Sequence, residues 1–225
     1  MPPPATASGS ALESFPALDS LGLVRHGFIG RLPGIDVATD RAEALARLDE
    51  THRALRAELG LGEMFFVTAE QVHGKEIALL PESSGTERCF SGVDGLVTNQ
   101  PRISLGIYVA DCCAVFLVDP VRKAIGLVHS GKKGTELAIV AQAIGKMQAA
   151  FGSAPRDLVV QLSPCIRPPH YEIDFAAEIV RQLRAAGVQQ VHDAGRCTAS
   201  DLARYYSYRA EKGRTGRMLA LLAIR

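Results

Sequence analysis

Short apolar runs separated by turn-forming residues recur along the chain, and these runs predict β-strands. Two of them form the central stretch of the sequence, in which a turn at Asp119-Pro120 joins a strand over residues 106–118 to a strand over residues 124–128. A glycine-rich bend and a helix start follow this pair. The other predicted strands span residues 21–29, 64–69, 76–80, 157–162 and 218–224, and a short segment at 93–99 contains Asp94-Gly95 as a turn.

Apolar residues at helical spacing predict a helix that begins after Thr39 or Asp40 and ends at Gly60. Three further helices are predicted over residues 135–151 with Thr135 as the N-cap and Gly152 at the end, over residues 174–186 with Asp174 as the N-cap, and after Ser200, where the helix carries residues 205–209. Because strands and helices are mixed without a regular β–α–β alternation, we expect an α+β fold rather than a doubly wound sheet.

A chain of 225 residues with 47% hydrophobic content can build one domain with a sizeable core. We expect that domain to span residues 16–225 and residues 1–15 to form a flexible N-terminal tail. The N-terminal sequence has neither a positively charged segment nor an apolar one, so it does not resemble a secretory signal. Residues 81–92 are polar and predict a loop.

Charge and composition exclude several classes of partner. The net charge is +1 and the chain has no Trp, so neither an electrostatic footprint for nucleic acid nor a base-stacking platform is expected. No apolar run is long enough to cross a bilayer, so we expect no membrane partner. The five cysteines are an odd number without regular spacing, which argues against a disulfide framework and favours a cytoplasmic protein with reduced thiols.

Three residues of the central stretch and its surroundings suggest metal chemistry. Cys112 lies in the first central strand, His129 ends the second, and His73 comes from an upstream Gln71-Val72-His73-Gly74 turn. Imidazole and thiolate are the ligands that zinc prefers, and a catalytic zinc site uses three of them. Because neighbouring strand residues point to opposite faces, only one of Cys112 and Cys113 is expected to reach this site. The alternative is that both thiols are buried apolar groups and both histidines are ordinary loop residues.

Asp111 stands beside these thiols at the end of an apolar run, where a carboxylate is costly to bury unless it is paired or hydrogen-bonded. It could orient a metal-binding histidine or hold a substrate hydroxyl. The same residues also support a second chemistry, in which Cys112 and a histidine form a thiolate–imidazolium pair for nucleophilic catalysis.

Lys132 and Lys133 follow His129 directly before a predicted helix N-terminus, an arrangement that suits phosphate. Arg31 could add a second positive group to such a site. The alternative is that all three are ordinary solvated surface residues.

Several short motifs, in a fixed order from about residue 20 to the C-terminus, resemble those of the YfiH family, also called the multicopper-polyphenol-oxidase-like or laccase-domain family. They are jointly specific, although none is specific alone. The motifs are His26-Gly27-Phe28 with Arg31, Gln71-Val72-His73-Gly74, Asp94-Gly95-Leu96-Val97-Thr98, Ala110-Asp111-Cys112, His129-Ser130-Gly131, Ser163-Pro164-Cys165-Ile166 with Tyr171-Glu172, Cys197-Thr198, Ser207-Tyr208-Arg209 and Thr215-Gly216-Arg217-Met218.

The resemblance implies a mixed β-sandwich with flanking helices, in α/β/β/α layers. It implies a zinc ion held by His73, Cys112 and His129, and it favours Cys112 over Cys113 because the family's ligand directly follows the Asp. The implied activities are phosphorolysis of adenosine, inosine, guanosine and methylthioadenosine, and deamination of adenosine. Other family names imply copper-dependent phenol oxidation, and some bacterial members are linked to peptidoglycan quality control.

One motif departs from the family, because His129 is followed by Ser-Gly-Lys-Lys-Gly where many members have Ala-Gly-Trp-Arg-Gly. Lys133 therefore stands where the family has an Arg, and it can meet phosphate only as a point charge.

These observations lead to the hypothesis of a zinc enzyme acting on purine nucleosides. In it, Asp111 orients the nucleophile or moves its proton, and Lys133 and Arg31 seat phosphate. The alternatives are a metal-free Cys112 amidohydrolase acting on cell-wall precursors, a copper-dependent phenol oxidase, and a zinc-stabilised domain that works through protein contacts.

Overall fold

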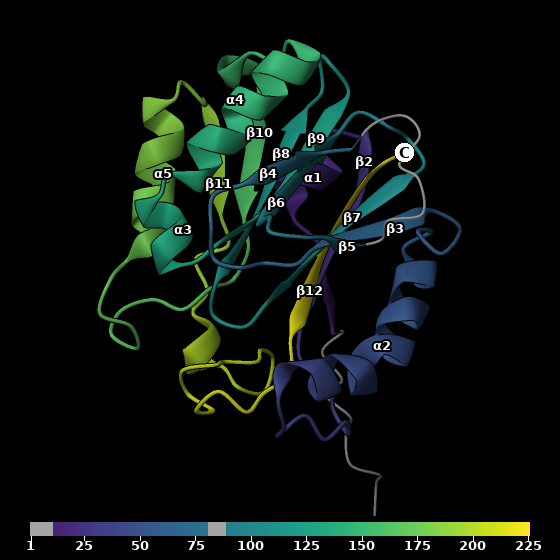
Figure 1. Ribbon diagram of the computed structural model, residues 1–225, viewed down its shortest axis with the longest axis vertical. Coiled ribbons are helices and arrows are strands. Elements are labelled where there is room, and N and C mark those ends of the chain that lie inside the picture. Colours follow the sequence, from purple (N-terminus) through teal and green to yellow (C-terminus); the bar gives the residue numbers. More distant parts are fainter. Residues whose placement is uncertain (1–10, 81–88) are drawn as a thin grey trace, which may run out of the picture.

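The computed structural model describes residues 11–80 and 89–225, and within them the strands form two six-stranded sheets (Figure 1). The first sheet has the order β1 (Leu12–Glu13), β2 (Val24–Ile29), β12 (Met218–Ile224), β7 (Ile103–Val109), β3 (Phe65–Ala69) and β5 (Cys89–Phe90). The second has the order β11 (Gln190–Asp193), β10 (Val159–Leu162), β8 (Cys113–Asp119), β9 (Ala124–Ser130), β6 (Gly95–Thr98) and β4 (Ile77–Leu79).

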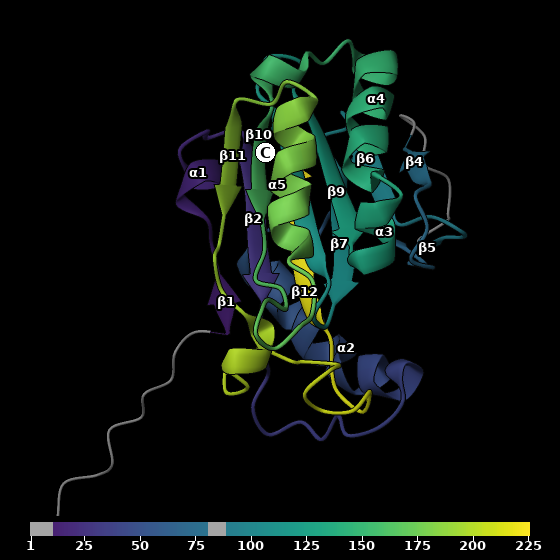
Figure 2. The same ribbon diagram turned by 90° about the vertical axis from the view of Figure 1, so that its left-hand side faces the viewer.

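The alternation of side chains along β8 explains why the second sheet is covered on both faces. Ala114 and Phe116 belong to the apolar cluster shared with the first sheet, whereas Cys113 and Val115 belong to a second cluster formed with helices. These helices are α4 (Ile139–Phe151) and α5 (Phe175–Ala185), which Figure 2 shows side by side over the sheet. The short helix α3 (Lys132–Glu136) contacts both of them.

Helix α2 (Arg41–Glu58) packs on the first sheet, so the layers run helix, sheet, sheet, helix (Figure 1). This confirms the predicted α+β fold in α/β/β/α layers. The Asp40 carboxylate accepts hydrogen bonds from the first amides of α2, and Gly60 follows the helix with a φ of 69°, so both predicted ends are confirmed. The helix approaches β2 so closely that a Cβ at Gly27 would lie 2.8 Å from a methyl group of Leu59.

His52 of α2 is a buried imidazole that makes stability depend on pH. Its exposed fraction is 2%, and neither ring nitrogen has a hydrogen-bond partner among the described residues. Burial disfavours the imidazolium and lowers the pKa of His52 to about 4, with Asp49 opposing and Arg56 adding to the shift. The unfolded chain, with a histidine pKa of about 6.5, therefore binds the proton first as the pH falls.

We expect the free energy of unfolding to decrease between about pH 6.5 and about pH 4, with His52 contributing roughly 2 kcal/mol of the loss by pH 5. His52→Leu should remove this contribution, which urea titrations at pH 7.5 and pH 5 would measure. His192→Leu, at an exposed histidine, is the control and should keep the decrease. Equal pH dependence in wild type and His52→Leu would contradict the expectation.

Several predicted elements differ from the structure. The run over residues 106–118 is two strands, β7 and β8, because the chain bends at Asp111, whose φ is 82°. The helix predicted over 135–151 begins earlier and is interrupted, since Ala138 adopts a left-handed conformation between α3 and α4. Thr135 therefore lies inside α3, and its hydroxyl donates to the carbonyl of Gly131 instead of capping.

The helix predicted after Ser200 is wrong, because only a short 3₁₀ turn, Thr198–Ser200, occurs there and residues 201–217 form turns and loops. Side chains accept hydrogen bonds from some of the backbone amides of this segment. Glu211, for example, accepts from the amide of Ser207 and the hydroxyl of Thr215. Asp94-Gly95, predicted as a turn, instead leads into the fully buried strand β6.

The boundary predicted for the N-terminal tail is also wrong. Leu12–Glu13 pairs with β2, Phe15 is 5% exposed, and the amide of Phe15 donates to Nε2 of His26. The four-residue helix α1 (Pro16–Asp19) follows and buries Leu18 in the core. Residues 1–10 of that tail, and residues 81–88 of the predicted loop, lie outside the described residues.

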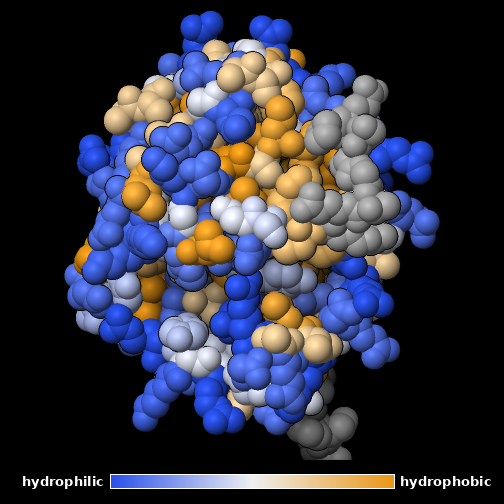
Figure 3. Space-filling model, viewed as in Figure 1, coloured by the Kyte–Doolittle hydropathy of each residue, from blue (hydrophilic) through white to orange (hydrophobic). Residues whose placement is uncertain are grey.

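Hydrophilic residues cover most of the face shown in Figure 3, and hydrophobic side chains gather in its upper middle, over β4 and β6. Leu79 of β4 contributes to the exposed apolar area, with 43% of its surface accessible.

Across residues 11–80 and 89–225, none of the helices is both long and apolar enough to cross a bilayer.

Candidate metal centre and its cavity

Strand pairing brings Cys112 and His129 together. In the register of β8 and β9, Cys113 lies opposite Ser130, and Ala114 lies opposite His129. Cys112, one residue before β8, therefore lies near Gly131, one residue after β9. A Cβ at Gly131 would lie 2.5 Å from the Cys112 sulfur. The glycine is therefore required for the thiol to occupy this position.

His73 reaches the same place from the loop between β3 and β4. Two residues of this loop, Gln71 and His73, have positive φ values of 65° and 59°, which non-glycine residues adopt only where other contacts hold them. The side-chain amide of Gln71 provides one such contact, since it hydrogen-bonds both the carbonyl and the amide of Tyr108 in β7. The backbone amides of residues 72–74 provide the other contacts, because they donate hydrogen bonds to the carboxylate of Asp94.

The predicted residues His73, Cys112 and His129 form a compact group whose ligand atoms lie within 4.8 Å of one another. The Cys112 sulfur is 3.9 Å from Nε2 of His73, and the two imidazole rings meet edge to face with centroids 4.8 Å apart. Ligand distances of about 2.0–2.3 Å in a tetrahedral zinc site place neighbouring ligand atoms roughly 3.5 Å apart. The three side chains could therefore bind one metal ion with only small movements.

The carboxylate of Asp94, at the start of β6, organises both histidines. One oxygen accepts from the His73 amide and lies 2.9 Å from Nδ1 of His129, and the other accepts from the amides of Val72 and Gly74. The Asp94 carbonyl also accepts from the amide of His129. Because Nδ1 of His129 is engaged in this way, its Nε2 is the nitrogen left to face the thiol and a metal ion.

Electrostatics at the centre favour the charged forms of these groups. Burial raises the pKa of the Asp94 carboxyl, but hydrogen bonds from His129 and from the loop amides outweigh it and lower the pKa overall. Burial likewise raises the pKa of the Cys112 thiol, but the positive charge of His129 and the hydrogen bonds from His129 and His73 together outweigh it and lower the pKa to about 6. Burial lowers the pKa of His129, whereas the Cys112 thiolate and the Asp94 carboxylate raise it to about 9.

The donor set fits a single zinc ion. The lowered pKa of Cys112 favours the thiolate at neutral pH, which is the form that binds metals. His129, whose pKa is raised to about 9, would bind a metal ion through Nε2 after releasing the proton held there. A thiolate with two imidazoles suits zinc or copper. Among residues 11–80 and 89–225, no second group of three or more His, Cys, Asp or Glu side chains has a comparable spacing. The described part of the chain therefore offers one metal position rather than the several that a multicopper oxidase requires.

The metal group lies in a cavity of about 450 Å³. Ile166, Tyr171 and Phe175 form an apolar and aromatic part of its lining, which we call the aromatic wall. The rings of Tyr171 and Phe175 meet edge to face, with their centroids 5.9 Å apart. The charged part of the lining is mainly cationic, because Asp111 lies there with Lys132, Arg209, Arg41 and Arg217. A cavity of this size with both kinds of surface suits a small polar aromatic ligand.

Asp111 lines the cavity but does not orient either histidine. Its oxygens accept from the Thr198 hydroxyl at 2.7 Å and from the Arg209 amide at 2.7 Å, and its carbonyl accepts from the Ile166 amide. The carboxylate that contacts the two histidines is that of Asp94. Asp111 fixes the bend that carries Cys112 and ties it to two loops of the cavity.

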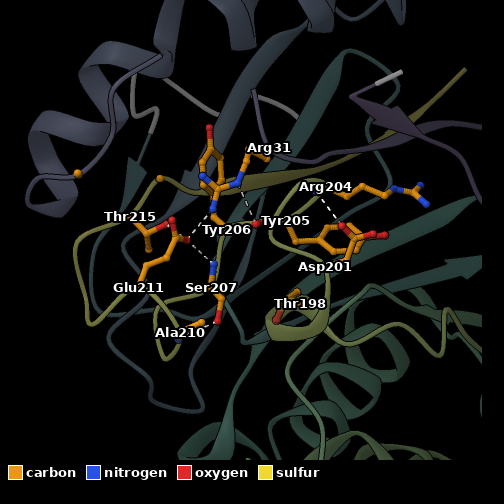
Figure 4. A network of polar contacts seen from close by, with 12 residues as sticks. Arg31, Thr198, Asp201, Arg204, Tyr205, Tyr206, Ser207, Ala210, Glu211 and Thr215 are labelled. Atoms are coloured by element: carbon orange, nitrogen blue, oxygen red, sulfur yellow. Dashed lines mark hydrogen bonds and ion pairs between the residues drawn. The ribbon is translucent and has the colours of Figure 1, made fainter. Parts of the chain in front are cut away.

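Arg31, predicted to bind phosphate, is not among the residues that line the cavity. Its guanidinium pairs with Glu211 at 2.7 Å, donates to the carbonyl of Tyr205 and lies 4.4 Å from the ring centre of Tyr206 (Figure 4). These contacts hold the 198–217 segment against the chain that follows β2. The structure therefore does not bring Arg31 to the metal centre, and the acid that pairs with it is distant in sequence.

Lys133 is likewise absent from the cavity lining, where its neighbour Lys132 is present. Successive side chains of a helix are about 100° apart, so only one of two adjacent lysines in α3 can face the site. Of the two lysines in the pattern, the structure places Lys132 and not Lys133 at the cavity.

Sequence reasoning also missed Asp94 and the cavity arginines. Asp94-Gly95 looked like a turn, and only the contacts show that its carboxylate is buried. Arg209 and Arg217 stand within motifs that the sequence did reveal. The signal for Arg217 is a charged residue directly before the fully apolar strand β12.

The family described as "Multi-copper polyphenol oxidoreductase laccase" matches residues 28–178 and 169–225 of the chain. Among curated relatives, "Purine nucleoside phosphorylase YlmD" of Geobacillus stearothermophilus is 29% identical over 85% of this chain and 82% of its own length. "Purine nucleoside phosphorylase" of Deinococcus radiodurans is 29% identical over 97% of this chain and 95% of its own length.

Solved structures show the same fold. The crystal structure of YlmD from Geobacillus stearothermophilus superposes with a TM-score of 0.84 at 24% identity and covers 98% of both chains. The crystal structure of Bacillus licheniformis hypothetical protein YfiH superposes with a TM-score of 0.78 at 22% identity, covering 90% of this chain and 93% of that chain.

Proposed function

This chain belongs to the multi-copper polyphenol oxidoreductase laccase family, the YfiH-like family that its motifs resemble, and we propose that it is a zinc-dependent purine nucleoside phosphorylase. The observation that carries the proposal is the His73–Cys112–His129 group in the lining of a cavity with an aromatic wall and several cationic side chains. The names of its relatives supply the reaction class, and the lining of the cavity has groups that suit the base and the phosphate.

The aromatic wall suits the purine base. Tyr171 offers a ring face for stacking, and the Arg209 guanidinium already lies 4.7 Å from that ring centre. The proposed substrates are adenosine, inosine, guanosine and methylthioadenosine. These share a purine and a ribose, and a stacking surface accepts all of them.

In phosphorolysis, a phosphate oxygen forms a bond to C1′ of the ribose while the bond from C1′ to the base breaks. The base leaves with the bonding electrons and takes up a proton. The cationic side chains of the cavity neutralise the phosphate, and Asp94 holds both histidines in place. A zinc ion at the three ligands would supply Lewis-acid chemistry, which polarises an oxygen of the reactants.

Deamination of adenosine is a second reaction proposed for the same cavity. It consumes water instead of phosphate and releases ammonia, so the two reactions are separated by assaying adenosine with and without phosphate. Phosphate-dependent release of adenine reports the first reaction, and phosphate-independent formation of inosine reports the second.

The test combines metal analysis with these assays. We expect about one zinc per chain in the purified protein and phosphate-dependent release of base from inosine, lost after chelation and restored by added zinc. Zinc-loaded protein that releases no base from any of the four nucleosides would contradict the proposal.

Other outcomes would favour the alternatives. Activity on an amide that survives chelation but not thiol alkylation would favour the Cys112–His129 pair as a nucleophile. Phenol oxidation only with copper would favour the oxidase. Zinc loss that lowers the melting temperature of an inactive protein would favour a structural role.

A further inference from the structure

The cationic side chains of the cavity fall into two groups with different surroundings. Arg209 is 53% exposed and pairs with Glu172 at 3.0 Å, and Lys132 is close enough to help lower the pKa of the Glu172 carboxyl. This group already contains its own counterion. The other group, Arg41 and Arg217, has no carboxylate partner among the described residues.

Arg217 is held with one edge of its guanidinium free. Its Nη1 donates to the carbonyls of Thr215 and Gly216 at 2.8 and 2.9 Å. The Nε and Nη2 groups, which form the edge that grips an oxyanion with two parallel hydrogen bonds, have no acceptor in the described part of the chain. The side chain is only partly exposed and lines the cavity, so this edge is available to a bound ligand.

Arg41 and Arg217 are also unfavourable neighbours for each other. Burial lowers the pKa of Arg217, the positive charge of Arg41 lowers it further, and Tyr208, Cys112 and Asp111 oppose the shift. Arg41 begins α2 and its guanidinium donates to the carbonyl of Glu70. Two positive charges that line one cavity repel each other, and an anion bound between them would offset this repulsion.

We propose that Arg41 and Arg217 form the subsite that binds inorganic phosphate, and that this subsite faces the metal centre. The placement follows from the fold, because Met218 pairs with Val109 and Arg217 therefore lies beside the bend that carries Cys112. A phosphate held there lies between the arginine pair and the metal ligands, while the aromatic wall remains free for the base. The inference rests on the proposed phosphorylase function, and it replaces Arg31 and Lys133 as phosphate ligands.

The test measures phosphate binding directly as well as turnover. Arg217→Gln should weaken the binding of inorganic phosphate to zinc-loaded protein, measured by titration calorimetry without nucleoside, by about tenfold or more. The KM for phosphate should rise by a similar factor while the KM for inosine changes little. Arg217→Lys keeps the charge but not the two-bond edge and should lie in between. Arg41→Gln, at an exposed helix position, tests the pair without disturbing the core.

Arg156→Gln is the matched control, since Arg156 is 75% exposed and outside the cavity lining. Unchanged phosphate affinity in both Arg217→Gln and Arg41→Gln would overturn the inference, even if the enzyme cleaves nucleosides. Loss of phosphate binding in these variants of a protein that cleaves no nucleoside would support the subsite and refute the function. Weaker binding of inosine 5′-monophosphate with unchanged binding of inorganic phosphate would show that the pair holds a phosphate carried by the substrate, which contradicts the co-substrate role.

Discussion

Cys112→Ala protein is expected to purify without zinc and to release no base from inosine, whereas the wild type carries about one zinc per chain. The substitution removes the one thiolate among three ligand side chains that lie within 4.8 Å of one another. Two imidazoles alone bind zinc far more weakly than a set completed by a thiolate. Mass spectrometry of the purified protein measures its zinc content, and the phosphorolysis assay measures the release of base.

Cys113→Ala is the matched control, because it removes the same group one position along the chain. Cys113 is fully buried on the opposite side of β8, where its sulfur contacts the carbonyls of Ala114 and Ser163. This variant should keep stoichiometric zinc and activity, with a loss of stability on the order of 1 kcal/mol. Stoichiometric zinc in Cys112→Ala, or its absence in Cys113→Ala, would show that the wrong thiol has been assigned.

Local sequence patterns were sufficient to predict much of the fold. The caps Asp40, Asp174 and Gly152 act within one turn of their own helices, and all three are confirmed. The closing strand at residues 218–224 is equally local, since a continuous apolar run bounded by charged residues has few other structures available. The family motifs added the α/β/β/α layering, which no single segment specifies.

The failures share a physical cause, namely contacts between residues distant in sequence. The bend at Asp111 depends on Thr198 and Arg209, and the irregular 201–217 segment depends on Arg31 pairing with Glu211 (Figure 4). A pattern of apolar residues contains no information about such pairings. The same limit applies to the site. Residue type and motif could suggest the ligand residues, but only the three-dimensional structure shows that Lys132, and not Lys133, lines the cavity.

Asp94→Asn is expected to lower zinc affinity by about 10- to 100-fold, the usual range for a residue that positions a metal ligand. All four partners of the Asp94 carboxylate are N–H groups: three loop amides and Nδ1 of His129. Asparagine offers one oxygen and one NH₂ group, so whichever way its amide is turned, an NH₂ faces two N–H donors. Either the loop that carries His73 or the ring of His129 then loses its support, and the histidines no longer converge.

Competition with a chromophoric chelator measures this loss independently of turnover. Asp119→Asn provides the matched comparison, because Asp119 is also a fully buried acid in the second sheet, but only one of its carboxylate oxygens accepts hydrogen bonds from the described residues. That oxygen accepts from the amides of Val121 and Arg122, while the other has no partner among the described residues. Asparagine can reproduce this pattern, so Asp119→Asn should bind zinc like the wild type. Equal zinc affinity in Asp94→Asn and Asp119→Asn would mean that the histidines are positioned by the backbone alone, and that the carboxylate contributes only to folding.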